Sequence, residues 1–453
     1  MTYEETLAWL HSMPRVHTAP TLARVRALLF MAGNPQDALA GRFLHVTGTN
    51  GKGSVCAFLS TVLRRQGYRV GRFISPFIME FRERMEIDGS QITEDEVIAL
   101  GAELHTIVNR YTEETGQTPL EFELVTVMGL LWFARRACDY VVLEVGIGGT
   151  YDPTNIVSPL LSVIMRVDYD HTELLGGTLA EIAAQKAGII KPGAPCVLYE
   201  ENDAAVVDVI ARKCRETGSL LVRPDLTALH IDAAKPGKIA FTYRGVPYRL
   251  RLSGIYQVRN AAAALEALLL LPSLGVALSQ DAIAEGLAET TFPARFEVIS
   301  EAPLILLDGA HNASGMEALA ENIRFYFNGK PLLFLCGMLC DKHPEEALSA
   351  VLGPQTDGGG AVYCACITPP SPRAMPAETL CSVFRGAGIS ADAYADIRVA
   401  LDALCEMRRQ LLTDKDGEEA ADDYPILCFG SLYSAGDIRR ACGLLCESDT
   451  ADV

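Results

Sequence analysis

Basic residues are scarce in this chain. Against 57 Asp and Glu stand only 39 Lys and Arg, so the 453 residues carry a formal charge of −18. A surface that binds nucleic acid needs a basic field, and we therefore expect no nucleic-acid partner. Charged residues make up 21% of the chain and hydrophobic residues 49%, which excludes extensive disorder. Anionic ligands would have to be met by a few Lys and Arg residues placed close to them.

Long uninterrupted apolar runs are also lacking. The most apolar stretch, residues 261–278, contains Glu266 and Pro272, so it predicts a buried helix followed by a loop rather than a membrane span. The N-terminal sequence MTYEETLAWLH is acidic and has no apolar signal region. We expect a cytoplasmic protein without membrane contact. The 13 Cys residues are scattered, and Cys364 and Cys366 have no second pair at zinc spacing, which favours reduced thiols.

Strands and helices are predicted to alternate along the chain. Residues 42–48 form a short β-prone run, and the residues after Lys52 repeat their apolar positions with helical spacing. Residues 139–146 and 160–168 are nearly continuous apolar runs, which are typical of parallel strands covered on both faces. A second alternating series begins near Leu304. The pattern predicts an α/β protein with doubly wound sheets.

The length predicts more than one domain. We place the boundary near Pro293, with a doubly wound N-terminal domain at residues 1–293 and a smaller, Rossmann-like α/β domain at residues 294–453. The acidic residues 414–423 predict a solvated loop, and residues 447–453 predict a frayed tail.

The sequence VTGTNGKGSV, residues 46–55, suggests a phosphate-binding loop. It departs from the pattern G-x-x-x-x-G-K-[ST], because Val46 replaces the first glycine and Gly53 replaces the Ser or Thr. Gly48 and Gly51 would still let backbone N–H groups converge at a helix N-terminus, which attracts anions. Lys52 would reach across the phosphates. On the loop alone, an ordinary glycine-rich turn is the alternative.

The loop resembles the nucleotide loop of the Mur ligase superfamily, with the pattern G-T-x-G-K-[GST]-[ST], and most of all its folylpolyglutamate synthase branch. Further motifs follow in the family's order: GYRVGRFISPF (67–77), LEVGIGG (143–149), DHTELLG (170–176), KAGIIKPG (186–193), YQVRN (256–260), PARFE (293–297), DGAHN (308–312) and GSLY (430–433). The resemblance spans nearly the whole chain and implies that the N-terminal domain is a P-loop-type ATPase domain that also binds folate. It implies that the C-terminal domain is a glutamate-ligase domain.

The resemblance implies an ATP-dependent ligase that adds L-glutamate to a reduced folate, tetrahydrofolate, through an acyl phosphate. We expect a monomer. A bifunctional enzyme that also acts as a dihydrofolate synthase on dihydropteroate is the first alternative. A cell-wall Mur ligase, a nucleotide-driven switch or motor and a non-catalytic nucleotide binder are less favoured, because they do not explain the folate-branch motifs together with Lys52, Glu144, His171 and Lys186.

Metal ligands are expected at the carboxyl ends of the predicted strands. Ser75, Glu144 and His171 each lie at or just beyond such an end, where open α/β sheets bind ligands. A lone carboxylate such as Glu144 in an apolar strand is costly to bury without a cation or a basic partner, and a structural salt bridge is the alternative. The resemblance implies two Mg²⁺ ions, held by Ser75, Glu144, His171 and a carbamylated Lys186. It also implies catalytic roles for Lys52, His171 and Lys186, although a salt-bridging lysine is the alternative for Lys186.

The resemblance also implies the nucleotide contacts. Asn260 would contact adenine, Arg295 the phosphates, and Asp308 and His311 the ribose and phosphates. Arg82 and Arg84 would meet an anionic folate tail or form a solvated face. The loop residues expected to bind ATP are Gly48, Thr49, Asn50, Gly51, Lys52, Gly53 and Ser54.

Four residues depart from the pattern of many family members. Phe77 and Tyr256 replace histidines, Thr150 replaces an arginine, and Ala294 replaces a glycine. Phe77 and Tyr256 resemble the branch that only lengthens the glutamate tail, which favours tetrahydrofolate as the main substrate.

Overall fold

The computed structural model describes residues 1–15, 21–342, 344–352, 360–413 and 424–443. The chain divides into two compact units. The first unit comprises residues 1–229, 243–245 and 259–290, and the second unit comprises residues 230–242, 246–258 and 291–453. The predicted solvated loop at 414–423 and the predicted tail at 447–453 lie outside the described residues. Between residues 229 and 259 the chain passes several times from one unit to the other. The domain boundary that we place between residues 293 and 294 from the sequence stays a prediction.

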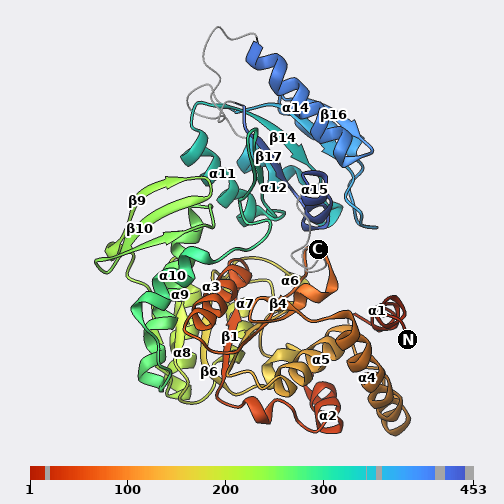
Figure 1. Cartoon of the computed structure of the whole chain (residues 1–453), viewed down its shortest axis with the longest axis vertical. Helices are drawn as coiled ribbons and strands as arrows, with labels where there is room; N and C mark the ends of the chain where they lie inside the picture. The colour runs from red at the N-terminus through yellow and green to blue at the C-terminus, as the bar shows by residue number, and fades with distance from the viewer. Residues whose placement is uncertain (16–20, 343, 353–359, 414–423, 444–453) are drawn as a thin grey trace. The chain divides into compact units, whose positions relative to one another are not determined.

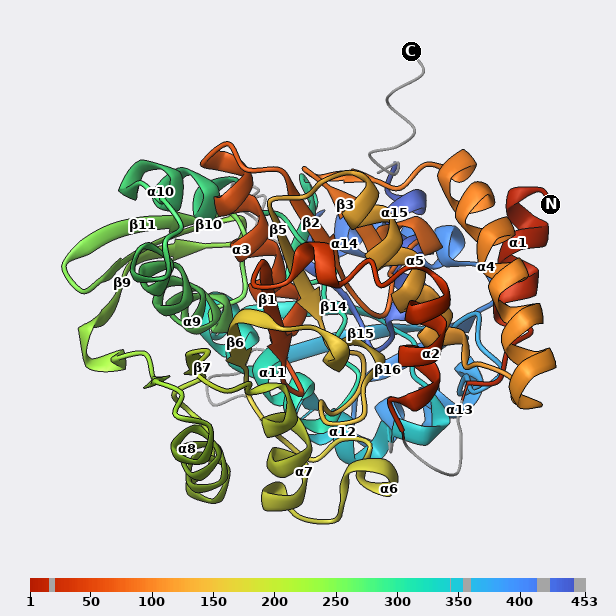
Figure 2. The same cartoon turned by 90° about the horizontal axis from the view of Figure 1, so that it is seen from below.

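The first unit is built on an eight-stranded sheet with the order β4-β3-β2-β5-β1-β6-β7-β8 (Figure 2). The strands are β1 (Phe43–Thr47), β2 (Val70–Phe73), β3 (Met85–Ile87), β4 (Ser90–Gln91), β5 (Tyr140–Glu144), β6 (Pro159–Ile164), β7 (Cys196–Leu198) and β8 (Leu221–Val222). The six strands other than β3 and β4 run parallel, whereas β3 and β4 form an antiparallel edge. The carboxyl ends of β1, β2, β5 and β6 therefore lie at the same edge of the sheet.

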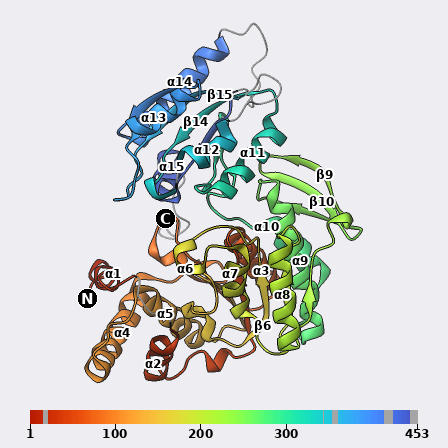
Figure 3. The ribbon, with the colours of Figure 1, turned by 180° about the vertical axis from the view of Figure 1, so that it is seen from behind.

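Ten helices lie wholly or partly in this unit within the described part of the chain. They are α1 (Tyr3–His11), α2 (Ala23–Met31), α3 (Lys52–Arg65), α4 (Glu94–Thr115), α5 (Glu121–Arg135), α6 (Thr172–Leu175), α7 (Leu179–Lys186), α8 (Ala204–Thr217), α9 (Tyr256–Leu270) and α10 (Gln280–Glu289). One apolar cluster packs α1, α2, α4 and α5 against β1 and β5. A second packs α7 and α8, which lie side by side in Figure 3, against β6 and β7.

The helix predicted after the glycine-rich loop is confirmed as α3. Its apolar positions, including Phe58 and Val62, are fully buried. Gly286 of α10 approaches this helix so closely that a Cβ atom at residue 286 would lie 2.6 Å from the Val62 Cα. The glycine therefore sets how near the two helices can pack.

The predicted buried helix and loop at residues 261–278 are also confirmed. Helix α9 ends at Leu270, and a short 3₁₀ helix follows at Leu271–Leu274. Glu266 is buried, and its carboxylate accepts a hydrogen bond from the Tyr243 hydroxyl at 2.5 Å and pairs with Arg244 at 2.7 Å. No helix among the described residues is both long enough and apolar enough to cross a membrane.

The second unit contains a six-stranded sheet with the order β12-β13-β17-β14-β15-β16. Its strands are β12 (Glu297–Glu301), β13 (Leu304–Leu307), β14 (Pro331–Cys336), β15 (Gly360–Ile367), β16 (Ser390–Tyr394) and β17 (Ile426–Phe429), and its helices are α11 (Ala313–Phe327), α12 (Pro344–Leu352), α13 (Ala377–Gly386), α14 (Ile397–Thr413) and α15 (Ala435–Ala441). All strands but the antiparallel edge strand β12 are parallel. Helices α11, α12 and α13 share one apolar cluster with β14, β15 and β17.

A separate three-stranded sheet, which the sequence did not predict, has the order β11-β10-β9 (Figure 1). It consists of β9 (Leu229–Lys235), β10 (Lys238–Tyr243) and β11 (Val246–Leu250). Strand β9 is largely exposed and carries charged residues, so its apolar signal is weak. The predicted α/β class with doubly wound parallel sheets is nevertheless confirmed in both units.

One ion pair is deeply buried among the helices of the first unit. The Arg24 Nε atom of α2 lies 3.0 Å from Glu123 Oε1 of α5, and the side chains are 7% and 2% exposed. The Glu123 carboxylate also accepts a hydrogen bond from the Leu120 backbone N–H at 2.8 Å. Loss of the carboxylate would leave the Arg24 charge buried without this partner.

We expect Glu123→Ala to lower the free energy of unfolding by about 3–5 kcal/mol, measured by guanidinium denaturation, because it leaves a buried charge uncompensated. Glu103→Ala is the matched control, since it removes the exposed Arg135–Glu103 pair at 2.7 Å and should cost about 1 kcal/mol at most. An equal decrease in the free energy of unfolding in the two variants would contradict a stabilising role of the buried Arg24–Glu123 pair.

Candidate active site

The glycine-rich loop joins β1 to α3 and depends on two glycines. Gly48 has φ 153° and Gly51 has φ 87°. A Cβ atom at residue 48 would lie 2.7 Å from the Met165 Cβ, and one at residue 51 would lie 2.8 Å from the Asn260 Oδ1. The second approach brings Asn260 of α9 directly against the loop. Two of the predicted nucleotide contacts therefore meet within the first unit.

Lys52 folds back over the same loop. Its Nζ atom donates to the Gly48 carbonyl at 3.1 Å and to the Thr49 carbonyl at 3.2 Å. Thr49 is fixed in turn, because its N–H donates to the Arg166 carbonyl at 2.7 Å and its hydroxyl oxygen accepts from the Asp168 N–H at 3.0 Å. The loop is thus tied to the segment that follows β6.

The remaining loop residues continue this arrangement. Asn50 forms an isolated β-bridge with Arg166. Gly53 and Ser54 lie in the first turn of α3, where Ser54 is 2% exposed. The first N–H groups of an α-helix have no carbonyl partner within that helix, which is why the sequence predicts an anion at the start of α3.

The structure brings Ser75 and Glu144 together. Glu144 is the last residue of β5 and is 4% exposed, and its Oε2 accepts a hydrogen bond from the Ser75 N–H at 3.2 Å. Both residues therefore lie at the carboxyl ends of neighbouring strands, as predicted: Ser75 just beyond β2, and Glu144 at the end of β5. Beyond Ser75, the Arg84 guanidinium lies 5.0 Å from the Phe77 ring centroid, and Arg82 pairs with Glu80 at 2.9 Å.

His171 lies beyond β6 in a more open setting. It has φ 49° and is the N-cap residue of the short helix α6, and its side chain is 43% exposed. Its backbone N–H donates to Asp170 Oδ1 at 3.0 Å, and its Nε2 lies 3.8 Å from Asp170 Oδ2.

Lys186 is the last residue of α7 and is 3% exposed. Burial and the positive charge of Lys52 lower the pKa of its amine to about 7, while Asp170 and Asp152 act in the opposite direction. Two lysines are thus close enough to repel each other at this edge of the sheet. A lysine with so low a pKa is partly unprotonated near neutrality.

The loop after Glu144 packs on the backbone around Lys186. A Cβ atom at Gly149 would lie 2.7 Å from the Gln185 carbonyl oxygen and 3.0 Å from the Lys186 Cα. Thr150 donates to the Gln185 carbonyl through its N–H at 2.8 Å and its hydroxyl at 2.9 Å. Thr150, which departs from the pattern of many family members, therefore satisfies a carbonyl at the end of α7.

Asp152 was missed from the sequence. It is 5% exposed, and it accepts hydrogen bonds from the Ile147 N–H at 2.9 Å and from the Thr154 hydroxyl at 2.5 Å. Burial raises the pKa of this carboxyl, and the hydrogen bonds oppose that rise. The signal was present as Asp152-Pro153, an N-cap residue followed by proline at the start of a 3₁₀ helix.

The second unit holds another polar group, centred on Asp308 at the end of β13. Asp308 is 4% exposed, and its Oδ1 accepts from the Ala310 N–H at 2.7 Å. Burial raises the pKa of this carboxyl, and the positive charge of Arg295 opposes the rise. The His311 ring Nδ1 lies 2.7 Å from the Gly309 carbonyl oxygen. Arg295, Asp308 and His311 therefore belong to one neighbourhood.

Ala294, which replaces a glycine found in many family members, has a backbone conformation that favours glycine. Ala294 has φ 53°, in the left-handed region that favours glycine, and its carbonyl accepts from the Gly309 N–H at 2.8 Å. Phe296, on the other side of Arg295, has φ 52°. Arg295 is thus presented by two neighbouring residues in the left-handed region.

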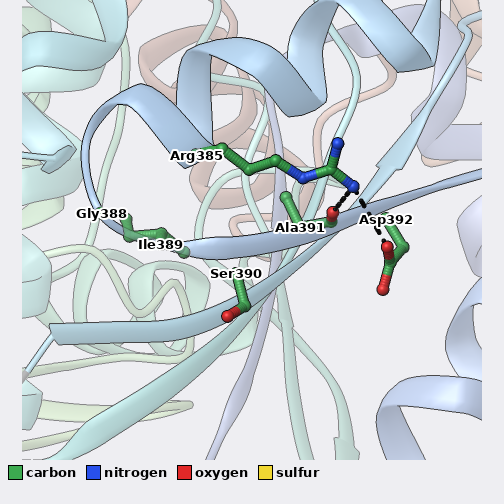
Figure 4. Close-up of a pocket in the computed structure, with 6 residues that line it drawn as sticks. All are labelled: Arg385, Gly388, Ile389, Ser390, Ala391 and Asp392. Carbon is green, nitrogen blue, oxygen red and sulfur yellow. Dashed lines mark hydrogen bonds and ion pairs between the residues drawn. The ribbon is translucent and has the colours of Figure 1, made fainter.

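A surface hollow in the second unit contains none of the predicted site residues. It is lined by Arg385, Gly388, Ile389, Ser390, Ala391 and Asp392 (Figure 4). The Arg385 guanidinium spans it and donates to the Ala391 carbonyl and to Asp392 Oδ1, the latter at 3.2 Å. Its charge is already engaged by the protein.

Within the residues that the structure describes, no group of three or more His, Cys, Asp or Glu side chains is arranged to hold a metal ion. The predicted Mg²⁺ site has a different composition, because only Glu144 and His171 of its four members belong to these types. The buried Glu144 carboxylate suits a hard cation, which prefers oxygen ligands. The described cysteines are free thiols, as predicted.

Comparison with known proteins gives the family. The family profile "Mur ligase middle domain" matches residues 46–268, and "Mur ligase, glutamate ligase domain" matches residues 294–413. A folylpolyglutamate synthase of Lacticaseibacillus casei is 36% identical over 97% of this chain and 98% of its own. A dihydrofolate synthase/folylpolyglutamate synthase of Bacillus subtilis is 34% identical over 97% and 98%.

A solved structure shows the same architecture. The folylpolyglutamate synthase of Mycobacterium tuberculosis, complexed with ADP and AMPPCP, superposes with a TM-score of 0.84 at 27% identity and covers 97% of this chain and 98% of its own. The resemblance read from the motifs is thereby confirmed over the length of the chain. This protein belongs to the folylpolyglutamate synthase branch of the Mur ligase family.

Proposed function

We propose that this protein is an ATP-dependent carbon–nitrogen ligase that joins L-glutamate to the tail of tetrahydrofolate. One observation carries the proposal: the glycine-rich loop, Lys52, Glu144 and the buried Lys186 are gathered at the carboxyl edge of one sheet. This is the edge at which α/β sheets bind ligands. The relative from L. casei bears the name of the same activity.

The reaction has to activate a carboxylate, which is a poor electrophile. Transfer of the ATP γ-phosphoryl group to the folate carboxylate gives an acyl phosphate and ADP. The glutamate amine then attacks the acyl carbon, the amide bond forms, and phosphate leaves. Lys52 balances the negative charge of the triphosphate, and the N–H groups at the start of α3 hold its oxygens.

The metal site proposed here uses Ser75, Glu144, His171 and Lys186. A bound Mg²⁺ would supply positive charge against the phosphates. Glu144 is nearly buried, and its carboxylate accepts a hydrogen bond from the Ser75 N–H. This hydrogen bond holds the carboxylate in place for a cation. Lys186 would join as a carbamate, formed when its unprotonated amine adds CO₂ and releases a proton. Its burial next to Lys52 supports this assignment, and its lowered pKa agrees with it.

The nucleotide contacts are proposed on the same basis. Residues 48–54 hold the phosphates, and Asn260, whose side chain lies against Gly51, contacts the adenine. Arg295, Asp308 and His311 contact the phosphates and the ribose. We also propose that residues 1–293 and 294–453 act as the ATP-and-folate and glutamate-ligase domains, in a monomer located in the cytoplasm.

A second activity is favoured by one comparison. The B. subtilis relative, which matches nearly the whole chain, is named for dihydrofolate synthase as well as folylpolyglutamate synthase. Both reactions share the acyl phosphate, but dihydropteroate presents its carboxylate one glutamyl unit closer to the pterin. Phe77 and Tyr256 favour the tail-lengthening reaction.

We expect ATP turnover to require tetrahydrofolate and glutamate together, measured as ADP release and as the mass of the lengthened folate. Either substrate alone should give only background, because the acyl phosphate is productive only when the amine is present. A motor would hydrolyse ATP without either substrate, and a non-catalytic binder would give no turnover. Dihydropteroate is supplied in a parallel reaction, and turnover equal to that with tetrahydrofolate would overturn the single activity while leaving the ligase intact.

Lys52→Ala should lower kcat by about 100-fold or more, because it removes a preorganised charge from the phosphates. Lys238→Ala is the control, since Lys238 is an exposed lysine of β10. Unfolding curves of the two variants should match that of the parent protein. Near-normal kinetics of Lys52→Ala at saturating ATP would refute its assignment to the phosphates.

For Lys186, ¹³C-labelled bicarbonate should give a carbamate signal in the NMR spectrum of the active enzyme. The signal should disappear in Lys186→Ala and persist in Lys191→Ala. Lys191 is the appropriate control because its amine donates to the Asn155 and Gly188 carbonyls at 3.3 and 3.4 Å. An active enzyme with no carbamate signal would contradict the carbamate and leave Lys186 as a salt-bridging lysine.

A further inference from the structure

Tyr256, which replaces a histidine found in many family members, reaches the carboxylate of Asp308. Its hydroxyl donates to Asp308 Oδ2 at 3.0 Å. The other oxygen, Oδ1, accepts from the Ala310 N–H at 2.7 Å. Both residues belong to the second unit. The two hydrogen bonds hold the carboxylate from both sides and restrict its rotation about the Cβ–Cγ bond.

The segment that carries Tyr256 is itself fixed. The Ile255 N–H donates to Asn322 Oδ1 of α11 at 2.7 Å, which anchors the start of α9. The Tyr256 ring lies against Gly254, where a Cβ atom would be 2.6 Å from the ring Cε1 and 2.7 Å from Cζ. Any other residue at position 254 would push the ring away. Gly254 therefore makes room for the ring that delivers the hydroxyl to Asp308.

The environment makes this hydrogen bond consequential. Asp308 is nearly buried, and burial disfavours its charged form, while Arg295 and the Tyr256 hydroxyl favour it. Hydrogen bonds to a charged group contribute more than those between neutral groups. A carboxylate that is held in one orientation can accept hydrogen bonds from the hydroxyls of a ribose without first losing rotational freedom.

We propose that Tyr256 is a positioning residue for nucleotide binding, which orients the Asp308 carboxylate toward the ribose hydroxyls of ATP. The proposal rests on the proposed contact between Asp308 and the nucleotide. Tyr256 does not touch the reacting atoms, so its effect falls on binding rather than on the chemical step. A histidine at position 256 would also present an N–H donor.

The test measures the dissociation constant of AMPPCP by calorimetry, together with KM for ATP and kcat. Tyr256→Phe should weaken AMPPCP binding by about 10-fold and raise KM by the same factor, with kcat nearly unchanged. Tyr256→His should recover most of the affinity. A fall in kcat at constant KM, or no recovery with histidine, would overturn the positioning role.

A double-mutant cycle with Asp308→Asn separates this inference from the proposed function. If Tyr256 acts through Asp308, Tyr256→Phe should have little further effect on affinity in the Asp308→Asn background. If Asp308→Asn alone leaves affinity unchanged, the nucleotide role of Asp308 fails. If Asp308→Asn weakens binding but Tyr256→Phe does not, only the positioning role fails.

The matched control is Tyr363→Phe. The Tyr363 hydroxyl donates to Asp392 Oδ2 at 2.9 Å, so this variant removes another tyrosine–aspartate hydrogen bond from the same unit. It should leave AMPPCP affinity unchanged. An equal loss of affinity in Tyr363→Phe would mean that loss of any tyrosine–aspartate hydrogen bond in this unit, rather than orientation of Asp308, explains the effect.

Discussion

The burial of the Lys186 amine, whose pKa is lowered by that burial and by the charge of Lys52, is the constraint on which the proposed site of the first unit depends. Lys52 is the first residue of α3, just beyond β1, and Lys186, the last residue of α7, is almost fully buried. Such an arrangement is costly in the protein alone and becomes favourable when negative charge arrives. In a chain with a net charge of −18, the two lysines form a local exception that suits an anionic ligand.

Close backbone contacts maintain that arrangement. Gly149 lets its loop lie against the backbone of Lys186, and Thr150 satisfies the Gln185 carbonyl at the end of α7. Asp152 secures the same loop through the Ile147 N–H. The residues between β5 and β6 therefore fix where Lys186 can lie, although none of them is proposed to touch the substrate.

In the second unit the corresponding constraint is a buried negative charge. A nearly buried carboxylate, Asp308, is balanced by Arg295 and by the hydroxyl of Tyr256. Arg295 is presented between two residues with left-handed backbone conformation, one of which is Ala294. The alanine adopts a conformation that glycine adopts more easily, so the backbone at this position is strained.

The sequence by itself determined the parallel sheets, the loop from Gly48 to Ser54 and the family, because apolar periodicity and ordered motifs are local properties of a chain. It did not determine the sheet of β9–β11, whose exposed strand β9 lacks an apolar pattern. Nor did it identify Asp152 or the partner of Tyr256. Those roles depend on which distant backbone and side-chain atoms meet: Tyr256 and Asp308 are 52 positions apart and are joined only when β13 and the start of α9 pack within one unit. Tertiary structure decided these contacts, since a hydrogen bond requires atoms within about 3 Å and sequence spacing carries no such distance.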